Sequence, residues 1–85
     1  MGKLIPLVEL KEGEEGIIVG IHGGHGLRRN LEGLGVAPGR KVKMISKHFR
    51  AGPVVISAVG TQVAMGYGMA RKILVQPLPK SSAAG

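Results

Sequence analysis

Two histidines three positions apart are the first candidates for metal chemistry. His22 and His25 enclose two glycines in the segment HGGHG, residues 22–26. Imidazole nitrogens suit Fe(II) or Zn(II), but protein zinc sites use three or four ligands, and this chain has no Cys and no Asp to complete one. We interpret the segment as a flexible loop with solvated histidines. We expect such a loop to bind divalent metal weakly or adventitiously at most, and we expect no cofactor.

A set of catalytic side chains is not recognisable. Ser46 and His48 belong to one expected strand without an acid beside them, while Glu12, Glu14 and Glu15 gather in one turn. Nucleophilic catalysis needs a nucleophile, a base and a group that orients the base. We therefore predict no catalytic residue and expect a protein that is not an enzyme.

Positive charge is the strongest compositional signal, and it is unevenly distributed. The 85 residues carry 12 Lys and Arg against 5 Asp and Glu, which gives +7, with −2 on residues 1–26 and +9 on residues 27–85. Such an excess favours an acidic protein surface, anionic lipid headgroups or a nucleic acid. Aromatic residues make up only 2% of the chain, so platforms for base stacking are scarce and nucleic acid is the less favoured partner.

The basic residues fall on one expected helix and one expected strand edge. Solubility and protection of that edge by Lys are the plain interpretation, and docking of a partner is the functional one. The predicted partner-binding residues are Arg28, Arg29, Leu31, Leu34, Arg40, Lys41 and Lys43. Lys47 and Arg50 belong to the same basic strand edge as Arg40, Lys41 and Lys43.

The helix is expected over residues 27–34. Leu27, Leu31 and Leu34 recur at helical spacing, so all three are predicted first as core residues. Gly35 follows as a left-handed cap, and residues 37–40 form a type II turn with Pro38 and Gly39 at its centre.

Short strands separated by Gly and Pro account for the remainder. They are expected at 17–21, 40–49, 54–59, 62–65 and 72–76, with a tight turn at Gly60-Thr61 and a helical turn over 66–70. The third strand is nearly all apolar and is predicted to be buried on both faces. The fold class is mainly β: a small, closed SH3-like barrel of about five strands, with one inserted α-helix and a second helical turn before the last strand. The domain is expected over residues 1–76, with a flexible tail over 77–85.

Export and membrane insertion are not expected from this sequence. Residues 1–10 lack the features of a signal peptide, and the uncharged stretch 51–70 holds too many glycines and polar residues for a lipid-facing helix. The absence of Cys fits a reducing compartment. We expect a cytoplasmic protein without a membrane span.

Four segments in order resemble the ferrous iron transport protein A (FeoA) family. They are LKEGEEGIIVGI (10–21), LEGLGVAPG (31–39), GPVVISAVGTQVAM (52–65) and the series Ala70, Ile73 and Val75. The resemblance covers about residues 7–76. The signature positions that the resemblance implies are Gly16, Leu31, Leu34, Gly35, Pro38, Gly39, Gly52, Pro53, Gly60, Ala70, Ile73 and Val75. The chain departs from the family pattern at Asn30, where a basic residue is usual, and at residues 48–53.

The resemblance implies a non-enzymatic accessory protein of bacterial ferrous iron uptake. Such a protein would dock on the cytosolic part of a FeoB-type Fe(II) transporter and modulate it, and it could form homo-oligomers. An alternative is a nucleic-acid-binding barrel of the KOW type, because residues 13–21 have a Gly-x-x-Gly-x-Val pattern. The acidic turn beside that strand opposes this alternative.

Overall fold

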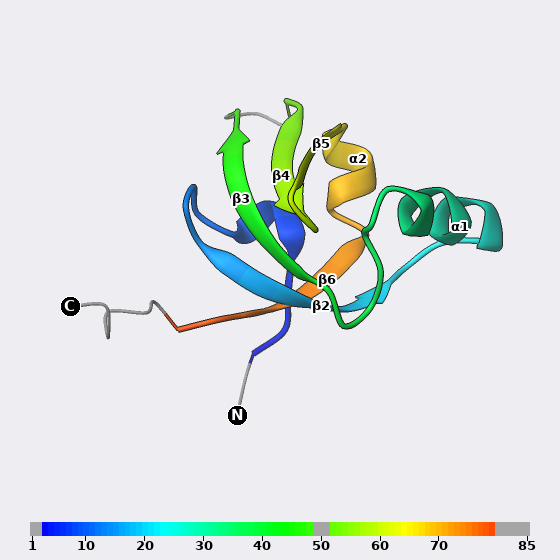
Figure 1. Ribbon diagram of the computed structural model, residues 1–85, viewed down its shortest axis with the longest axis horizontal. Helices are drawn as coiled ribbons and strands as arrows, with labels where there is room; N and C mark the ends of the chain where they lie inside the picture. The colour runs from blue at the N-terminus through cyan, green and yellow to red at the C-terminus, as the bar shows by residue number, and fades with distance from the viewer. Residues whose placement is uncertain (1–2, 49–51, 80–85) are drawn as a thin grey trace.

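The described residues, 3–48 and 52–79 of a computed structural model, form one antiparallel sheet with three short helices (Figure 1). The sheet has the strand order β1-β6-β2-β3-β4-β5. The elements are β1 (Ile5–Pro6), the 3₁₀-helix η1 (Leu7–Glu9), β2 (Glu15–Ile21), α1 (His25–Gly33), β3 (Lys41–Lys47), β4 (Val54–Ala58), β5 (Thr61–Met65), α2 (Tyr67–Ala70) and β6 (Ile73–Pro77). The prediction of a mainly β, SH3-like fold with an inserted helix and a second helical turn is confirmed.

The sheet curls strongly but does not close. β1 pairs only with β6 and β5 pairs only with β4 within the described residues, so the prediction of a closed barrel without edges is wrong. Register shifts at Ile18/Gly20 in β2 and at Met44/Ser46 in β3 interrupt the ladders where these strands bend. β3 lies between β2 and β4, which means that the expected basic strand edge is an interior strand. Its lysines therefore do not protect an edge.

Alternation along the strands builds a single core under the sheet. Val42 and Met44 of β3 are buried and alternate with the exposed Lys41 and Lys43, as a period of two requires. β4 also alternates, with Val55 and Ser57 partly exposed, so its predicted burial on both faces is wrong. The largest fully buried side chains are Leu7, Leu10, Ile18, Leu31, Met44, Ile56 and Ile73, joined by Val36, Val42, Val54 and Val75.

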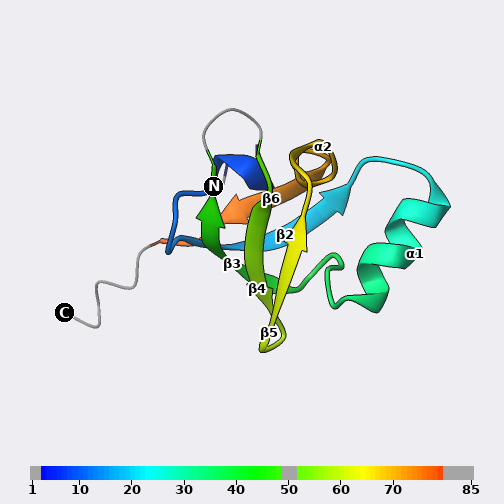
Figure 2. The same ribbon diagram turned by 90° about the horizontal axis from the view of Figure 1, so that it is seen from above.

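Helix α1 begins earlier than predicted and buries less. His25 and Gly26 belong to its first turn, and Gly24 is its N-cap residue, so the expected flexible loop is shorter than residues 22–26. Leu31 is fully buried and Leu27 is half-buried. Leu34 is 47% exposed because α1 ends at Gly33 and the helical face no longer continues. Both ribbon views show α1 projecting beyond one end of the sheet (Figures 1 and 2).

A Schellman motif ends α1 and returns the chain to the sheet. The N–H of Gly35 donates to the carbonyl of Glu32 at 3.0 Å, and the N–H of Val36 donates to the carbonyl of Leu31 at 2.9 Å. Gly35 has φ +89°, as the cap requires. The type II turn then forms as predicted, with Gly39 at φ +91° and Arg40 N–H donating to the Ala37 carbonyl.

The end of the domain lies slightly beyond the expected boundary. Pro77 is part of β6 opposite Gly16, and Leu78 N–H donates to the Glu15 carbonyl at 2.8 Å. The expected tail therefore begins with two residues that are paired to β2. Residues 80–85 of that tail, Phe49 at the end of the expected second strand and Arg50 of the expected basic strand edge lie outside the described residues.

Candidate functional site: a basic pocket beside a strained turn

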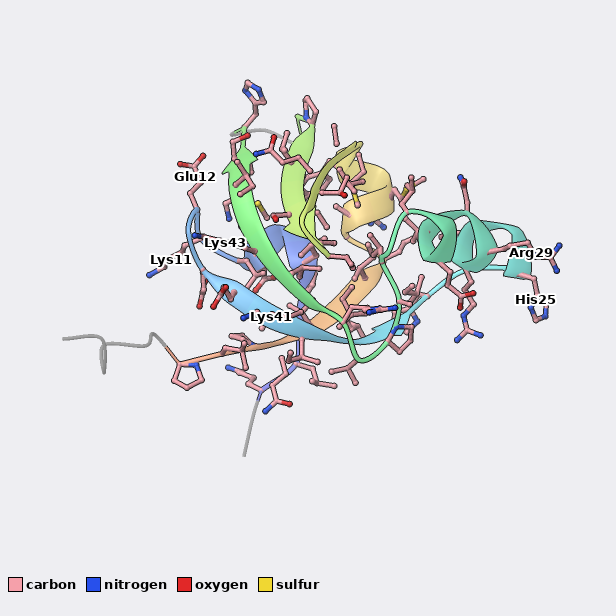
Figure 3. All side chains as sticks on the ribbon, in the orientation of Figure 1. Lys11, Glu12, His25, Arg29, Lys41 and Lys43 are labelled. Carbon is pink, nitrogen blue, oxygen red and sulfur yellow. The ribbon has the colours of Figure 1, made fainter. Side chains whose placement is uncertain are left out.

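The outer face of β3 carries the first half of the predicted partner-binding set. Lys41 and Lys43 are exposed on one face of this strand, and Arg40 is exposed directly before it. The intervening Val42 is buried and fixes the lysines outward. Figure 3 shows Lys41 and Lys43 along β3, far from the projecting α1. The structure thus gathers Arg40, Lys41 and Lys43 on one surface.

One carboxylate lies among these cations. Glu15 of β2 stands opposite Lys43 in the ladder, and its Oε2 atom is 3.7 Å from Nζ of Lys41. The Lys41 and Glu15 side chains are 60% and 40% exposed, so the pair stabilises the fold by at most about 1 kcal/mol. The positive charge of Lys41 is therefore partly balanced by Glu15. Within residues 3–48 and 52–79, Arg40 and Lys43 form no ion pair, and these two charges are free to meet an anionic partner.

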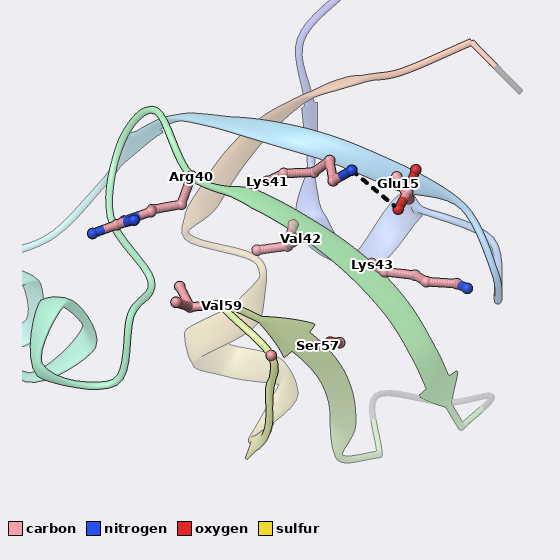
Figure 4. A pocket seen from close by; sticks show the side chains of 8 residues that line it. Glu15, Arg40, Lys41, Val42, Lys43, Ser57 and Val59 are labelled. Carbon is pink, nitrogen blue, oxygen red and sulfur yellow. Dashed lines mark ion pairs between the residues drawn. The ribbon is translucent and has the colours of Figure 1, made fainter. Parts of the chain in front are cut away.

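These side chains line a shallow pocket, here called the basic pocket. Its volume is about 350 Å³. It is lined by Glu15, Arg40, Lys41, Val42, Lys43, Ser57, Val59 and Gly60 (Figure 4). Three strands and the β4–β5 turn thus contribute to one surface that mixes positive charge with an apolar side chain.

The β4–β5 turn supplies a residue that sequence reasoning missed. The register pairs Ala58 with Thr61, so the two-residue loop is Val59-Gly60 rather than the predicted Gly60-Thr61. Val59 has φ +52° and Gly60 has φ +76°, as a type I′ turn requires. A β-branched residue in this region is an outlier that costs on the order of 1–3 kcal/mol. Val59 is nevertheless 61% exposed.

Helix α1 carries the second half of the predicted set on a separate surface. Arg28 and Arg29 are exposed, and a second shallow pocket of about 530 Å³ is lined by Gly26, Arg29, Asn30, Gly33 and Leu34. We call it the helix pocket. Leu31 lines neither pocket because its side chain is fully buried in the core. The seven predicted residues are thus divided between two surfaces and the core.

Lys47 differs from the other lysines of β3. Its Nζ donates to the carbonyl of Val8 at 2.9 Å in a partly buried position, and its backbone N–H donates to Oε2 of Glu12 at 3.2 Å. These bonds hold the end of β3 against η1 and against the turn between η1 and β2. Lys47 is therefore a structural residue, although its spacing from Lys43 suggested that it belonged to the same surface.

The two histidines do not form part of either pocket. His22 follows β2 and His25 begins α1, and both are exposed. Figure 3 shows His25 beside Arg29 at the outer end of α1. In the part of the chain that the structure describes, no three His, Cys, Asp or Glu side chains cluster closely enough to hold a metal ion. Likewise, no helix among residues 3–48 and 52–79 has the length and apolar character needed to cross a membrane.

Both a family model and a curated relative match most of this chain. The model of the FeoA domain family matches residues 5–77. A protein of Methanocaldococcus jannaschii named "Putative Fe(2+) transport protein A" is 41% identical over 73 residues, which cover 86% of this chain and 87% of the relative.

Solved structures agree with that match. A crystal structure of the iron uptake regulatory protein FeoA is 37% identical, with a TM-score of 0.83, and the match covers 89% of this chain and all of that one. The zinc-complexed FeoA of Stenotrophomonas maltophilia, described as a prokaryotic SH3 domain protein, shares the fold at 23% identity with a TM-score of 0.70, over 82% of this chain and 87% of its own. The extent of the family match and the identity to these relatives show that the chain belongs to the FeoA domain family.

Proposed function

We propose that this protein is a non-enzymatic accessory protein of ferrous iron uptake that docks on the cytosolic part of a FeoB-type Fe(II) transporter and modulates it. The observation that carries the proposal is the FeoA family match over residues 5–77, because a relative covering most of the chain bears the name of an Fe(2+) transport protein. This function places the protein in the cytoplasm.

The charge distribution supports docking by electrostatic attraction. Arg40 and Lys43 are exposed and form no ion pair among the described residues, and Arg28 and Arg29 are exposed on α1. A surface of this kind steers an acidic partner and increases the rate of association, an effect that salt screens. Neither surface combines its charge with aromatic side chains, so the same features give less support to binding of single-stranded nucleic acid.

The test is a binding assay between the full chain and the purified cytosolic part of the transporter. Two charge reversals separate the surfaces: Arg28→Glu/Arg29→Glu on α1 and Arg40→Glu/Lys43→Glu at the basic pocket. Arg71→Glu/Lys72→Glu is a matched control, because both residues are exposed and line neither pocket. Each variant changes the net charge equally.

We expect wild type and the control to bind and the basic-pocket reversal to weaken binding at least tenfold. Loss of binding in the α1 reversal alone would place docking on the helix instead. Absence of binding by a folded wild-type protein would sink the proposal. Fe(II) uptake by cells that produce each variant in place of wild type then measures modulation, and uptake should change only where binding changes.

A further inference from the structure

Val59 occupies a turn position that its side chain does not favour. In type I′ turns both central residues have positive φ, and Asn-Gly is the preferred pair. Val59 has φ +52° before a glycine at +76°. Asparagine would adopt this conformation at lower cost because its short polar side chain hydrogen-bonds locally. The chain thus has a strained valine at a turn position that asparagine would occupy at lower conformational cost.

The core does not account for this choice. Val59 is 61% exposed, more than Leu4, Val19 or Leu34, the other exposed large hydrophobic residues of the described chain. Its Cγ2 atom lies close to Gly35, and Val59 is one of the residues that line the basic pocket (Figure 4). An exposed and strained apolar side chain in a pocket points to contact with another molecule, since strain of this kind concentrates at functional positions.

The charges around Val59 define what that molecule must carry. Arg40 and Lys43 line the same pocket without an ion pair, while the Lys41 charge is shared with Glu15. A complementary ligand presents carboxylates to Arg40 and Lys43 and an aliphatic group to Val59. A nucleic acid would supply phosphates to these two cations, but it has no aliphatic side chain to cover the valine. The combination favours a peptide segment.

We propose that Val59 is the apolar anchor of a binding site for an acidic protein segment, in which one aliphatic side chain covers Val59 and flanking carboxylates contact Arg40 and Lys43. This inference rests on the proposed function, because the partner that supplies the segment is the cytosolic part of the transporter. Beyond the proposed docking, it specifies an acidic segment with an aliphatic side chain as the ligand and Val59 as the residue at the centre of the contact.

The experiment measures stability and affinity on the same three variants. Val59→Asn relieves the turn and removes the apolar surface. Val59→Thr keeps the β-branch and the strain but replaces a methyl group with a hydroxyl group. Val19→Thr is the control, because Val19 is 44% exposed and lines neither pocket. Calorimetric melting gives Tm, and titration with the transporter's cytosolic part gives Kd.

We expect Val59→Asn to raise Tm by about 4–8 °C while weakening binding about tenfold. Val59→Thr should weaken binding without raising Tm, and Val19→Thr should bind like wild type. The inference is overturned if Val59→Asn binds as tightly as wild type, or if it lowers Tm, since the valine would then serve the fold.

The same titration separates this inference from the function on which it rests. If wild type binds the transporter and the Val59 variants bind equally, docking stands and the anchor is wrong. If wild type does not bind, the proposed function is contradicted and the inference is overturned with it. Binding of a single-stranded RNA oligonucleotide that is lost in Val59→Asn would overturn the assignment to a protein segment.

Discussion

Gly35 and Val59 approach so closely that a β-carbon on residue 35 would lie 3.1 Å from Cγ2 of Val59. Gly35 ends the cap of α1, and Val59 lies in the turn between β4 and β5. This contact joins the projecting helix to the rim of the basic pocket. The C-terminal cap of α1 therefore packs close to the turn that lines the basic pocket.

Substitution of Gly35 tests this junction. Gly35→Ala should lower the free energy of unfolding by about 1–3 kcal/mol, because the residue has φ +89° and the added methyl group would press on Val59. Gly33→Ala is the matched control, since Gly33 lies in α1 with open space around its Cβ position, and alanine there should raise stability by up to about 1 kcal/mol. Urea unfolding measures both. Equal losses would show that residue 35 has no special role.

The leucines of α1 should differ sharply in their effect on stability. Leu31→Ala should cost about 2–5 kcal/mol because it opens a cavity in the core, where Leu31 is 0% exposed. Leu34→Ala should change stability by about 0.5 kcal/mol or less, because Leu34 is 47% exposed. Chemical denaturation of both variants provides the comparison. A large loss in Leu34→Ala would contradict the observed end of the helix.

The lysines of β3 should also separate into two kinds. Lys47→Ala should destabilise the protein by about 1–3 kcal/mol, because the charged amino group donates to the Val8 carbonyl at 2.9 Å. Lys43→Ala should leave stability nearly unchanged and should reduce affinity for the transporter's cytosolic part instead. Thermal melting and titration calorimetry distinguish the two effects. Destabilisation by Lys43→Ala as large as that by Lys47→Ala would be inconsistent with this division.

The histidines should not form a stoichiometric metal site. His22 and His25 are exposed, and no third ligand clusters with them in the described residues. Addition of one equivalent of Zn(II) or Fe(II) should therefore leave the imidazole NMR resonances of both residues in place. Saturable shifts of both, lost together in His22→Ala, would establish a metal site at the start of α1.

The sequence predicted correctly those features that depend on the backbone conformation of a few neighbouring residues. The Gly35 cap, the turn over residues 37–40 and the alternation of Lys41, Val42, Lys43 and Met44 depend on backbone conformation and strand period, and each prediction is confirmed. The fold class followed from the number of short strands and from the family resemblance.

Predictions failed for features that depend on strand pairing or on contacts between distant parts of the chain. Val59 looked like the last residue of a strand, and only the register of Ala58 with Thr61 shows that it belongs to the turn. β3 is an interior strand because it pairs with both β2 and β4, and the pattern of its own residues does not show these pairings. Lys47 repeats the spacing of Lys43, but its hydrogen bond to Val8 spans distant parts of the chain. The partner-binding assignments themselves stay predictions.

Docking through the basic pocket is tested most directly by the affinity of the full chain for the transporter's cytosolic part, measured by titration calorimetry at low and high salt. We predict saturable binding that weakens as salt rises, because salt screens the attraction between the basic pocket and an acidic partner. We further predict that Arg40→Glu/Lys43→Glu binds at least tenfold more weakly than Arg71→Glu/Lys72→Glu. No detectable binding by the folded wild-type protein, or binding that is insensitive to both salt and these charges, would show that the basic pocket does not dock on the transporter.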